Sequence, residues 1–416
     1  MNGGIDMTLY EDFKWRGLVK DVSSPELEEK LNNGGMTFYW GTDPTADSLH
    51  LGHYSSLVTA KRLARYGHHF ILLVGGATGL IGDPRPTAER EIIDKERLDK
   101  NIIGIQNQVK RLVDENTIFV NNYDWLKDYG YLNFLRDVGK YINVNYMLNK
   151  DIISRRLETG ITYAEFSYTL LQGYDFVHLA REYGCTLQAA GSDQWGNITT
   201  GIELGRKMDN KELYGFTMPL ILDSTGKKFG KSEGNALWLS KEKTSAYKIY
   251  QYLLNTDDSK VVEYLKVFTF LSKEEILELE KMQKECPEKR IAQKTLAKEV
   301  VRDIHGELEL DKAVRMSEAL FNGEFNSFKI DELEEIFSGY EQNAISKGIN
   351  IVDMLILMKV ATSKREAREF VSGNAISING EKVNSLDYVI SEKDFLCNKY
   401  MVVKRGKKNY YIGVME

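Results

Sequence analysis

The stretch FYWGTDPTADSLHLGH, residues 38–53, decides the fold, because within it a strand passes into a helix. The aromatic run at residues 38–40 predicts a strand, which the following glycine and Asp-Pro turn end. The residues after His53 show the apolar spacing of a helix. His50 and His53 are therefore expected on one side of the first helical turn.

This junction is suited to a nucleotide phosphate. Gly52 lies between the two histidines and leaves the backbone bare, so that a flat group could lie against it. The unpaired N–H groups and the positive dipole end of a helix N-terminus also favour an anion. Two alternatives stay open on these residues alone: a structural turn with two surface histidines, and a His-x-x-His metal pair. The other histidines show no ligand spacing that would complete a metal site.

The composition is that of a globular protein with two or three domains. Of the 416 residues, 42% are hydrophobic and 28% are charged. The sequence has no apolar run long enough to predict a membrane span, and its first residues do not resemble a signal peptide. Its three cysteines lie far apart, which argues against a disulfide scaffold or a zinc cluster and predicts a reducing, cytoplasmic location.

Charge is distributed unevenly. The net charge is −6, but residues 349–416 hold 11 Lys and Arg against 8 Asp and Glu, which gives +3 there and −9 elsewhere. So small an excess is often only a solvated face, yet its cations gather at a helix start and a hairpin tip, which suits a nucleic-acid backbone. The candidates for RNA contacts are Lys364, Arg365, Arg368, Arg405, Lys407 and Lys408.

The glycine-rich segment GGATGLIGDP, residues 75–84, follows an apolar run that predicts a strand buried in a parallel sheet. Such a loop is where an open α/β sheet forms its ligand crevice. Tight packing is the alternative, and the glycine spacing is not that of a dinucleotide-binding fingerprint. With residues 38–53 it predicts a βαβ unit. Further helices are expected at residues 88–114, 165–181 and 244–321, and further strands at residues 118–120, 187–190 and 217–222.

A carboxylate lies in the apolar helix expected at residues 165–181. Tyr168, Gln172 and Asp175 share one face of this helix. A carboxylate in such surroundings costs free energy unless another group donates to it. Asp175 is therefore expected either to pair with an internal lysine or arginine or to await a ligand.

The segment DSTGKKFGKS, residues 223–232, forms a lysine-rich loop. It is close to a Walker A loop, but only three residues separate Gly226 from Gly230, where the P-loop needs four. Lys228 and Lys231 are the candidates for phosphate contacts, and an exposed basic turn is the alternative.

These motifs, taken in order, resemble those of the bacterial tyrosyl-tRNA synthetases, which are class I enzymes. HLGH at residues 50–53 is similar to the family's HIGH signature, and KFGKS at residues 228–232 is similar to its KMSKS loop. The segments GGATGLIGDP, QGYDF and GSDQWGNIT lie between them in the family's order. The C-terminal part resembles an RNA-binding domain shared with a small-subunit ribosomal protein.

The resemblance implies an α/β fold with a Rossmann-like parallel-sheet catalytic domain, followed by an α-helical domain and a small α+β RNA-binding domain. The expected boundaries are residues 1–226 for the catalytic domain, 227–321 for the KFGKS loop and the helical domain on the anticodon side, 322–348 for a linker containing a short helix, and 349–416 for the RNA-binding domain.

The resemblance also assigns roles to matching positions. Tyrosine would be held by Tyr39, Asp83, Tyr168, Gln172, Asp175 and Gln194. ATP would be held by Gly41, Asp43, Thr45, His50, Gly52, His53, Ser56, Arg90, Gly191, Asp193, Lys228 and Lys231. The catalytic set would be Thr45, His50, His53, Lys228, Lys231 and Ser232.

The implied reaction joins L-tyrosine and ATP to give tyrosyl-adenylate and pyrophosphate, and then transfers tyrosine to the 3′-terminal ribose of its tRNA. Mg²⁺ would accompany ATP, and no protein-bound metal is expected. The alternatives are a tryptophanyl enzyme with the same fold, a nucleotidyltransferase that uses the histidine motif, and a non-catalytic RNA-binding relative.

Three departures from the family's pattern are visible. The segment at residues 83–90 is one residue shorter and lacks the family's lysine, for which Arg85 could substitute. Gly230 stands in place of the middle serine of KMSKS, and the bulky Trp40 follows Tyr39. The family also implies a homodimer, for which the apolar candidates are Phe134, Leu135, Val138, Tyr146 and Tyr163, unless these are ordinary core residues.

Overall fold

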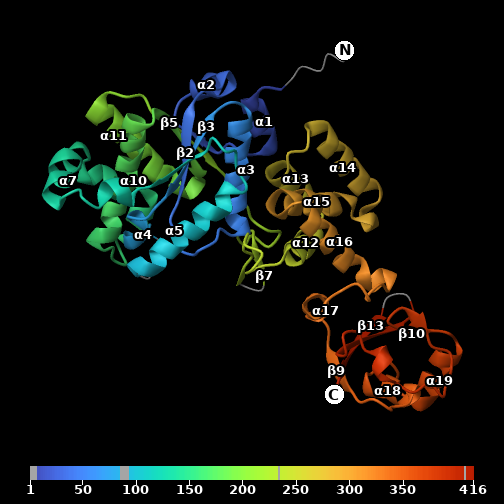
Figure 1. Ribbon diagram of the computed structural model, residues 1–416. Coiled ribbons are helices and arrows are strands. Elements are labelled where there is room, and N and C mark those ends of the chain that lie inside the picture. Colours follow the sequence, from blue (N-terminus) through green and yellow to red (C-terminus); the bar gives the residue numbers. More distant parts are fainter. Residues whose placement is uncertain (1–6, 85–92, 233–234, 407–408) are drawn as a thin grey trace. The chain divides into compact units, whose positions relative to one another are not determined.

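The computed structural model describes residues 7–84, 93–232, 235–406 and 409–416 (Figure 1). The chain forms two units, Met1–Gly306 and Glu307–Glu416, which are described separately.

A six-stranded sheet forms the centre of the first unit, in the order β1-β6-β5-β2-β3-β4. All neighbouring pairs are parallel except β1 with β6, so the expected parallel α/β sheet is confirmed. The strands are β1 (Asp21–Val22), β2 (Thr37–Thr42), β3 (His69–Val74), β4 (Ile118–Asn121), β5 (Cys185–Gly191) and β6 (Tyr214–Met218).

The strand expected at residues 217–222 is misplaced. β6 ends at Met218, because the next residue, Pro219, has no N–H for the ladder. Leu222 forms only an isolated bridge with Lys228.

Helices cover both faces of this sheet. α10 and α11 pack against each other (Figure 1), and a buried cluster joins Phe176 and Leu179 of α10 to sheet residues that include Tyr39 and Ile71. The helices of this part are α1 (Leu9–Arg16), α2 (Leu27–Asn33), α3 (Leu51–Arg65), α4 (Thr78–Ile81), α5 (Lys95–Lys110), α6 (Tyr123–Leu126), α7 (Tyr131–Asp137), α8 (Val144–Leu148), α9 (Asp151–Arg156), α10 (Tyr163–Glu182) and α11 (Trp195–Asp209), with 3₁₀ turns η1 (Gly139–Tyr141) and η2 (Ser192–Gln194).

Two helices of the following region, α13 and α15, fix the position of α3. The Lys61 ammonium lies 2.5 Å from the Asp303 carboxylate, and the Tyr54 hydroxyl donates to the same carboxylate at 2.7 Å. Arg62 donates to the carbonyl oxygen of Val267 at 2.9 Å. These contacts hold α3, and with it the histidine turn, against the helical region, which comprises α12 (Ala246–Leu254), α13 (Val261–Phe268), α14 (Lys273–Glu285), η3 (Pro287–Lys289) and α15 (Ile291–His305).

The second unit is built on a five-stranded sheet in the order β11-β10-β12-β13-β9. β9 lies in the stretch expected to be a linker, where it pairs in parallel with β13. Among the described residues, no helix of either unit is long and apolar enough to cross a membrane. The elements are α16 (Glu307–Asn322), α17 (Ile330–Phe337), β9 (Gln342–Ile345), α18 (Ile351–Leu357), α19 (Lys364–Ser372), β10 (Ile376–Ile378), β11 (Glu381–Lys382), η4 (Glu392–Asp394), β12 (Tyr400–Arg405) and β13 (Asn409–Met415).

Candidate active site

A cleft of about 1210 Å³ opens at the carboxyl ends of β2, β5 and β6, beside the start of α3. Parallel α/β sheets bind their ligands at this edge. Arg90 and the side chain of Ser232 lie outside the described part of the chain. Every other residue expected to hold tyrosine or ATP lines the cleft, namely Tyr39, Gly41, Asp43, Thr45, His50, Gly52, His53, Ser56, Asp83, Tyr168, Gln172, Asp175, Gly191, Asp193, Gln194, Lys228 and Lys231.

Asp175 is almost fully buried, and neutral donors hold it. Its two carboxylate oxygens accept from Asn122 Nδ2 and from Trp125 Nε1, each at 2.9 Å. The structure records no lysine or arginine on this carboxylate among the described residues, so of the two alternatives the internal ion pair is absent there. Burial raises the pKa of Asp175 to about 7, in spite of the two donors, and the charge of Asp43 acts in the same direction.

Two unpaired polar groups lie near this carboxylate. Tyr39 is 1% exposed and Gln188 is 2% exposed. The Tyr39 hydroxyl and Gln188 Oε1 are buried without a hydrogen-bond partner among the described residues. The two residues are directly opposite each other on β2 and β5, so their side chains lie on the same face of the sheet. We call Tyr39, Asp175 and Gln188 the inner group.

A chain of hydrogen bonds connects Asp175 with Asp43. Asn122 Nδ2 also donates to Thr78 Oγ1 at 2.9 Å, and the Thr78 hydroxyl donates to Asp43 Oδ1 at 2.7 Å. The Tyr168 hydroxyl donates to the other oxygen of Asp43 at 2.9 Å. Asp43, expected to hold adenosine, is thus fixed from both sides.

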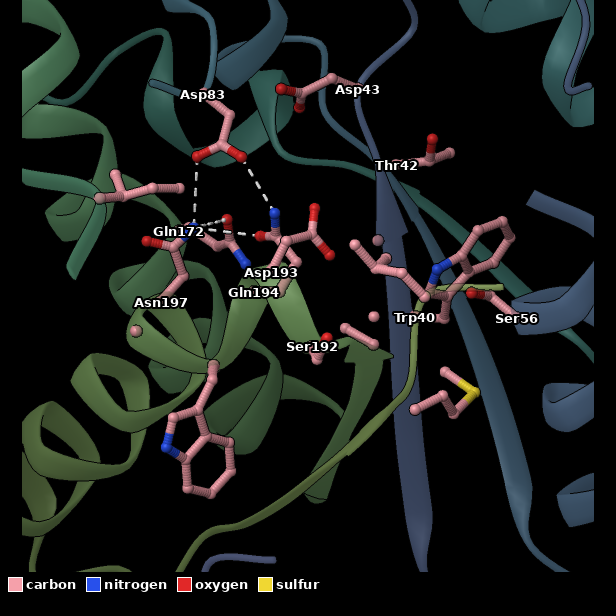
Figure 2. A pocket seen from close by; sticks show the side chains of 18 of the residues that line it. Trp40, Thr42, Asp43, Ser56, Asp83, Gln172, Ser192, Asp193, Gln194 and Asn197 are labelled. Atoms are coloured by element: carbon pink, nitrogen blue, oxygen red, sulfur yellow. Dashed lines mark hydrogen bonds between the residues drawn. The ribbon is translucent and has the colours of Figure 1, made fainter. Parts of the chain in front are cut away.

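A second group of polar side chains lies across the cleft (Figure 2). Gln194 Nε2 donates to Asp83 at 2.9 Å. Asn197 Nδ2 lies 3.0 Å from Gln172 Oε1, 3.0 Å from Gln194 Oε1 and 3.4 Å from Asp83. We call Asp83, Gln172, Gln194 and Asn197 the amide cluster. Its members are hydrogen-bonded to one another without any ligand.

The histidine turn closes on itself. His50 Nδ1 accepts from the Gly52 N–H at 3.1 Å, and His53 Nδ1 accepts from the His50 N–H at 3.3 Å. The rings stack with centroids 3.9 Å apart. Burial lowers the pKa of His53 to about 3 and, with Lys231 and Lys228, also lowers the pKa of His50. Each neutral ring therefore keeps its proton on Nε2, as a donor.

Gly52 is required by the packing of the histidine turn itself. The His50 ring folds over its backbone, and its Nδ1 accepts from the Gly52 N–H. A Cβ at Gly52 would lie 2.8 Å from His50 Cε1, which leaves no space for a side chain.

The lysine loop is docked on this turn. Phe229 packs between Tyr264 and Phe268, with ring centroids 4.7 and 4.5 Å away. Gly230 has φ +86°, and a Cβ there would lie 2.6 Å from the backbone nitrogen of Gly52. The glycine in place of the family's serine is therefore required by this close approach. The exposed Lys228 and the exposed Lys231, at the start of hairpin β7 (Lys231–Ser232) and β8 (Asn235–Ala236), extend from the docked segment.

Trp40, the unexplained bulky residue, lines the cleft beside Ser56 (Figure 2). It is 4% exposed and follows Tyr39 on β2, so the two side chains lie on opposite faces of the sheet. It therefore lies outside the inner group.

The sequence interpretation missed Asn122, Thr78, Trp125, Asn197 and Gln188. A usable signal existed for three of them. Asn122 comes two residues after the strand expected at residues 118–120, Thr78 lies within the glycine-rich segment 75–84, and Asn197 lies within the motif GSDQWGNIT. Gln188, inside a predicted strand, carried no such signal.

The cations expected to bind RNA are only partly available. Lys364 pairs with Asp353 at 2.6 Å, and Arg365 pairs with Glu369 at 3.1 Å. Exposed pairs of this kind contribute little and exchange readily for other partners. Arg405 donates to a backbone carbonyl, Arg368 is exposed, and Lys407 and Lys408 lie outside the described residues.

An exposed apolar surface lies on α7 and at the start of α10. Tyr131, Leu132 and Tyr163 are 61%, 78% and 61% exposed, and Leu135 is 36% exposed. Val138, expected at a dimer interface, is instead fully buried in a core against which Phe134 and Tyr146 pack. Val138 is therefore a core residue, while Phe134 and Tyr146 remain partly exposed beside that core.

Comparison with known proteins gives a consistent result. The family of class I tRNA synthetases (W and Y) matches residues 31–322, and the SYY-like C-terminal domain of tyrosine–tRNA ligases matches residues 332–413. The tyrosine–tRNA ligase of Staphylococcus carnosus (strain TM300) is 50% identical over 412 residues, covering 97% of this chain and 98% of that protein.

Solved structures agree in fold. A C-terminally truncated mitochondrial tyrosyl-tRNA synthetase of Aspergillus nidulans matches with a TM-score of 0.68 and 31% identity, over 76% of this chain and 95% of that one. The tryptophanyl-tRNA synthetase of Plasmodium falciparum matches with a TM-score of 0.54 and 14% identity, over 78% of this chain and 87% of that one. At that identity the likeness shows a shared fold alone.

Proposed function

This chain belongs to the tyrosine–tRNA ligases, which are class I aminoacyl-tRNA synthetases, and on that premise we propose how its cleft is divided between the substrates. The tryptophanyl, nucleotidyltransferase and non-catalytic alternatives are set aside by the full-length relatives. The roles of individual residues, the metal ion and the dimer are the proposal.

The inner group binds the phenol of tyrosine. A phenol hydroxyl would donate to the buried Asp175 and accept from Tyr39, whose own hydroxyl has no partner among the described residues. This buried, unpaired hydroxyl beside a buried carboxyl is the observation that carries the assignment. A site built to bond a hydroxyl rejects an amino acid lacking it because its own polar groups stay unpaired, and this enzyme family is the usual example of that rule.

The amide cluster and Tyr168 bind the ammonium group of tyrosine. An ammonium only donates hydrogen bonds, and the cluster presents oxygens of Asp83, Gln172 and Gln194. Both ends of the amino acid are thereby held, which directs its carboxylate toward the nucleotide half of the cleft.

The histidine turn and the lysine loop bind ATP. The substrate carboxylate is already ionised, so its attack on the α-phosphate needs no general base, and catalysis is positioning and charge stabilisation. The Nε2 protons of His50 and His53 and the ammonium groups of Lys228 and Lys231 would stabilise the pyrophosphate. Thr45 and Arg90 would assist them, and Gly41, Asp43, Ser56, Gly191 and Asp193 would hold adenosine.

Mg²⁺ would enter with ATP rather than occupy a site of the protein. Among the described residues, no three His, Cys, Asp or Glu side chains form a group that could hold a metal ion. The bound ion would neutralise part of the charge on the leaving pyrophosphate.

ATP–pyrophosphate exchange tests the division of the cleft. The purified chain is assayed with Mg²⁺ and each of the twenty amino acids, without tRNA. We expect exchange with tyrosine alone. Exchange with tryptophan would overturn the assignment of the inner group to a phenol, and exchange with no amino acid would overturn the assignment of the cleft.

The C-terminal unit binds the tRNA. Replacing Lys364 and Arg368 by glutamate should raise the KM for tRNA about tenfold, since each phosphate contact contributes to a salt-dependent electrostatic attraction. Exchange without tRNA should not change. Charge reversal is a cleaner test than deletion of residues 349–416, which would leave β9 without its neighbour β13. An unchanged KM for tRNA would remove these cations from the RNA site.

The exposed surface of Tyr131, Leu132 and Tyr163 forms the centre of a homodimer interface. Large exposed aromatic and aliphatic side chains in one patch are typical of such interfaces. Light scattering should give twice the chain mass for the native protein and a single chain mass for Leu132→Asp. A monomeric native protein would contradict the dimer.

A further inference from the structure

Asn197, on the first turn of α11, was not among the expected site residues, yet it contacts three of them. It is 9% exposed, and its single side-chain nitrogen faces oxygens of Gln172, Gln194 and Asp83. Figure 2 shows these side chains converging around it.

The hydrogen bonds fix which way each amide points. The Asp83 carboxylate only accepts, so the amide nitrogen of Gln194 must face it. The other end of that amide, Oε1, then faces Asn197, which must donate with Nδ2. The second proton of Nδ2 lies toward Gln172, so the atom of Gln172 on this side is its oxygen.

We infer that Asn197 is a positioning residue that orients the acceptors of the ammonium site, an inference that rests on the proposed function of the amide cluster. Without its two N–H donors, the amide of Gln172 is free to rotate, and the oxygen of Gln194, whose amide nitrogen stays bonded to Asp83, loses its donor. Rotation would present N–H groups to an ammonium, which can accept nothing. Asn197 touches no reacting atom in this scheme and acts only through its neighbours.

A ligand that lacks the ammonium isolates this role. Binding of L-tyrosine and of 3-(4-hydroxyphenyl)propionate, which has the phenol and the carboxylate alone, is measured by calorimetry for the native chain, Asn197→Ala and Asn197→Asp. We expect tyrosine to bind about 30-fold more weakly to Asn197→Ala, and more weakly still to Asn197→Asp, whose carboxylate cannot donate. The propionate should bind all three within about twofold.

A matched control separates orientation from folding. Asn101 of α5 is similarly buried and donates to the carbonyl of Pro44, and it does not line the cleft. Asn101→Ala should lower the melting temperature without changing the ratio of the two affinities. In Asn197→Ser, whose hydroxyl supplies one donor, part of the lost tyrosine affinity should return.

Two outcomes overturn different claims. Equal weakening of both ligands in Asn197→Ala would show a general loss of the cleft and overturn the positioning role. If Asp83→Asn and Gln172→Ala leave tyrosine affinity unchanged, the ammonium does not bind here, and the proposed function of the amide cluster fails instead.

Discussion

The amide cluster and the inner group, which we propose hold the two ends of the substrate tyrosine, differ in how their polar atoms are bonded. In the amide cluster, Asp83, Gln172, Gln194 and Asn197 are bonded to one another in the free protein. In the inner group, two buried polar atoms lack partners within the described part of the chain, and the buried Asp175 carboxyl has a pKa of about 7.

On the proposed function, the amide cluster contributes affinity for any amino acid, and the inner group contributes selectivity for tyrosine. The ammonium group is common to all amino acids, so a pre-arranged acceptor set binds it without choosing among side chains. The phenol hydroxyl distinguishes tyrosine from phenylalanine, and unpaired groups costing about 1–3 kcal/mol each are relieved only when a hydroxyl arrives. On this proposal, the unpaired polar atoms of the inner group lower the stability of the protein without tyrosine, and the same atoms select for the phenol hydroxyl.

Asp175→Ala should give the largest effect. The phenol loses its acceptor, and Asn122 and Trp125 lose the carboxylate to which they donate. Exchange with tyrosine should fall about 10³-fold, as is typical when one partner of a buried charged contact is removed. Circular dichroism should show a folded chain. Near-normal exchange would overturn the assignment of the inner group to the phenol.

Tyr39→Phe should weaken the selection while stabilising the free protein. Bound tyrosine loses one hydrogen bond, which weakens its binding by about 1 kcal/mol. Bound phenylalanine no longer leaves the Tyr39 hydroxyl unpaired, which strengthens its binding by about 1 kcal/mol. Together these changes lower the selectivity for tyrosine over phenylalanine roughly 30-fold. The melting temperature should rise, because a buried, unpaired hydroxyl is removed. A lower melting temperature with unchanged selectivity would mean that the hydroxyl is satisfied in the free protein.

Tyrosine binding should weaken as the pH falls. Burial raises the pKa of Asp175 to about 7, so the carboxylate that accepts the phenol proton is lost below that value. Affinity should therefore drop about tenfold between about pH 8 and pH 6. His53 does not titrate there, because its pKa is about 3, and burial with the nearby lysines lowers the pKa of His50, which moves its titration away from this range.

Phenylalanine is the control for this titration. It offers no hydroxyl to Asp175, so its weaker affinity should be independent of pH over the same range. A parallel loss for both amino acids would assign the titration to a group outside the inner group.

Sequence reasoning reached the parts of the site that are local in the chain. A strand followed by a helix start places His50 and His53, and a loop after a buried strand places residues 75–84 at the ligand edge. It failed where partners are distant. The donors to Asp175 are Asn122 and Trp125, which lie 53 and 50 positions earlier in the chain, and no spacing pattern in the sequence indicates these contacts.

Packing accounts for the remaining features that sequence reasoning did not reach. The purpose of Gly52 depends on a ring folding back over it, and that of Gly230 depends on the approach of a loop from elsewhere in the chain. Val138 has an apolar side chain whether it faces a partner or its own core, so composition alone could not place it. Pro219 did carry a readable signal that ended β6 early.

Gln188→Met should give the smallest effect. We expect Gln188 Oε1 to gain a hydrogen-bond partner, such as a trapped water molecule, only when tyrosine is bound. Removing it should lower selectivity about threefold, the lower end of a single hydrogen bond. Gln293 of α15 offers a matched control, since its Oε1 is also buried, has no hydrogen-bond partner among the residues that the structure describes, and does not line the cleft. Gln293→Met should leave selectivity unchanged. An equal response of both variants would mean that unpaired oxygens affect only stability, and that selection depends on Tyr39 and Asp175 alone.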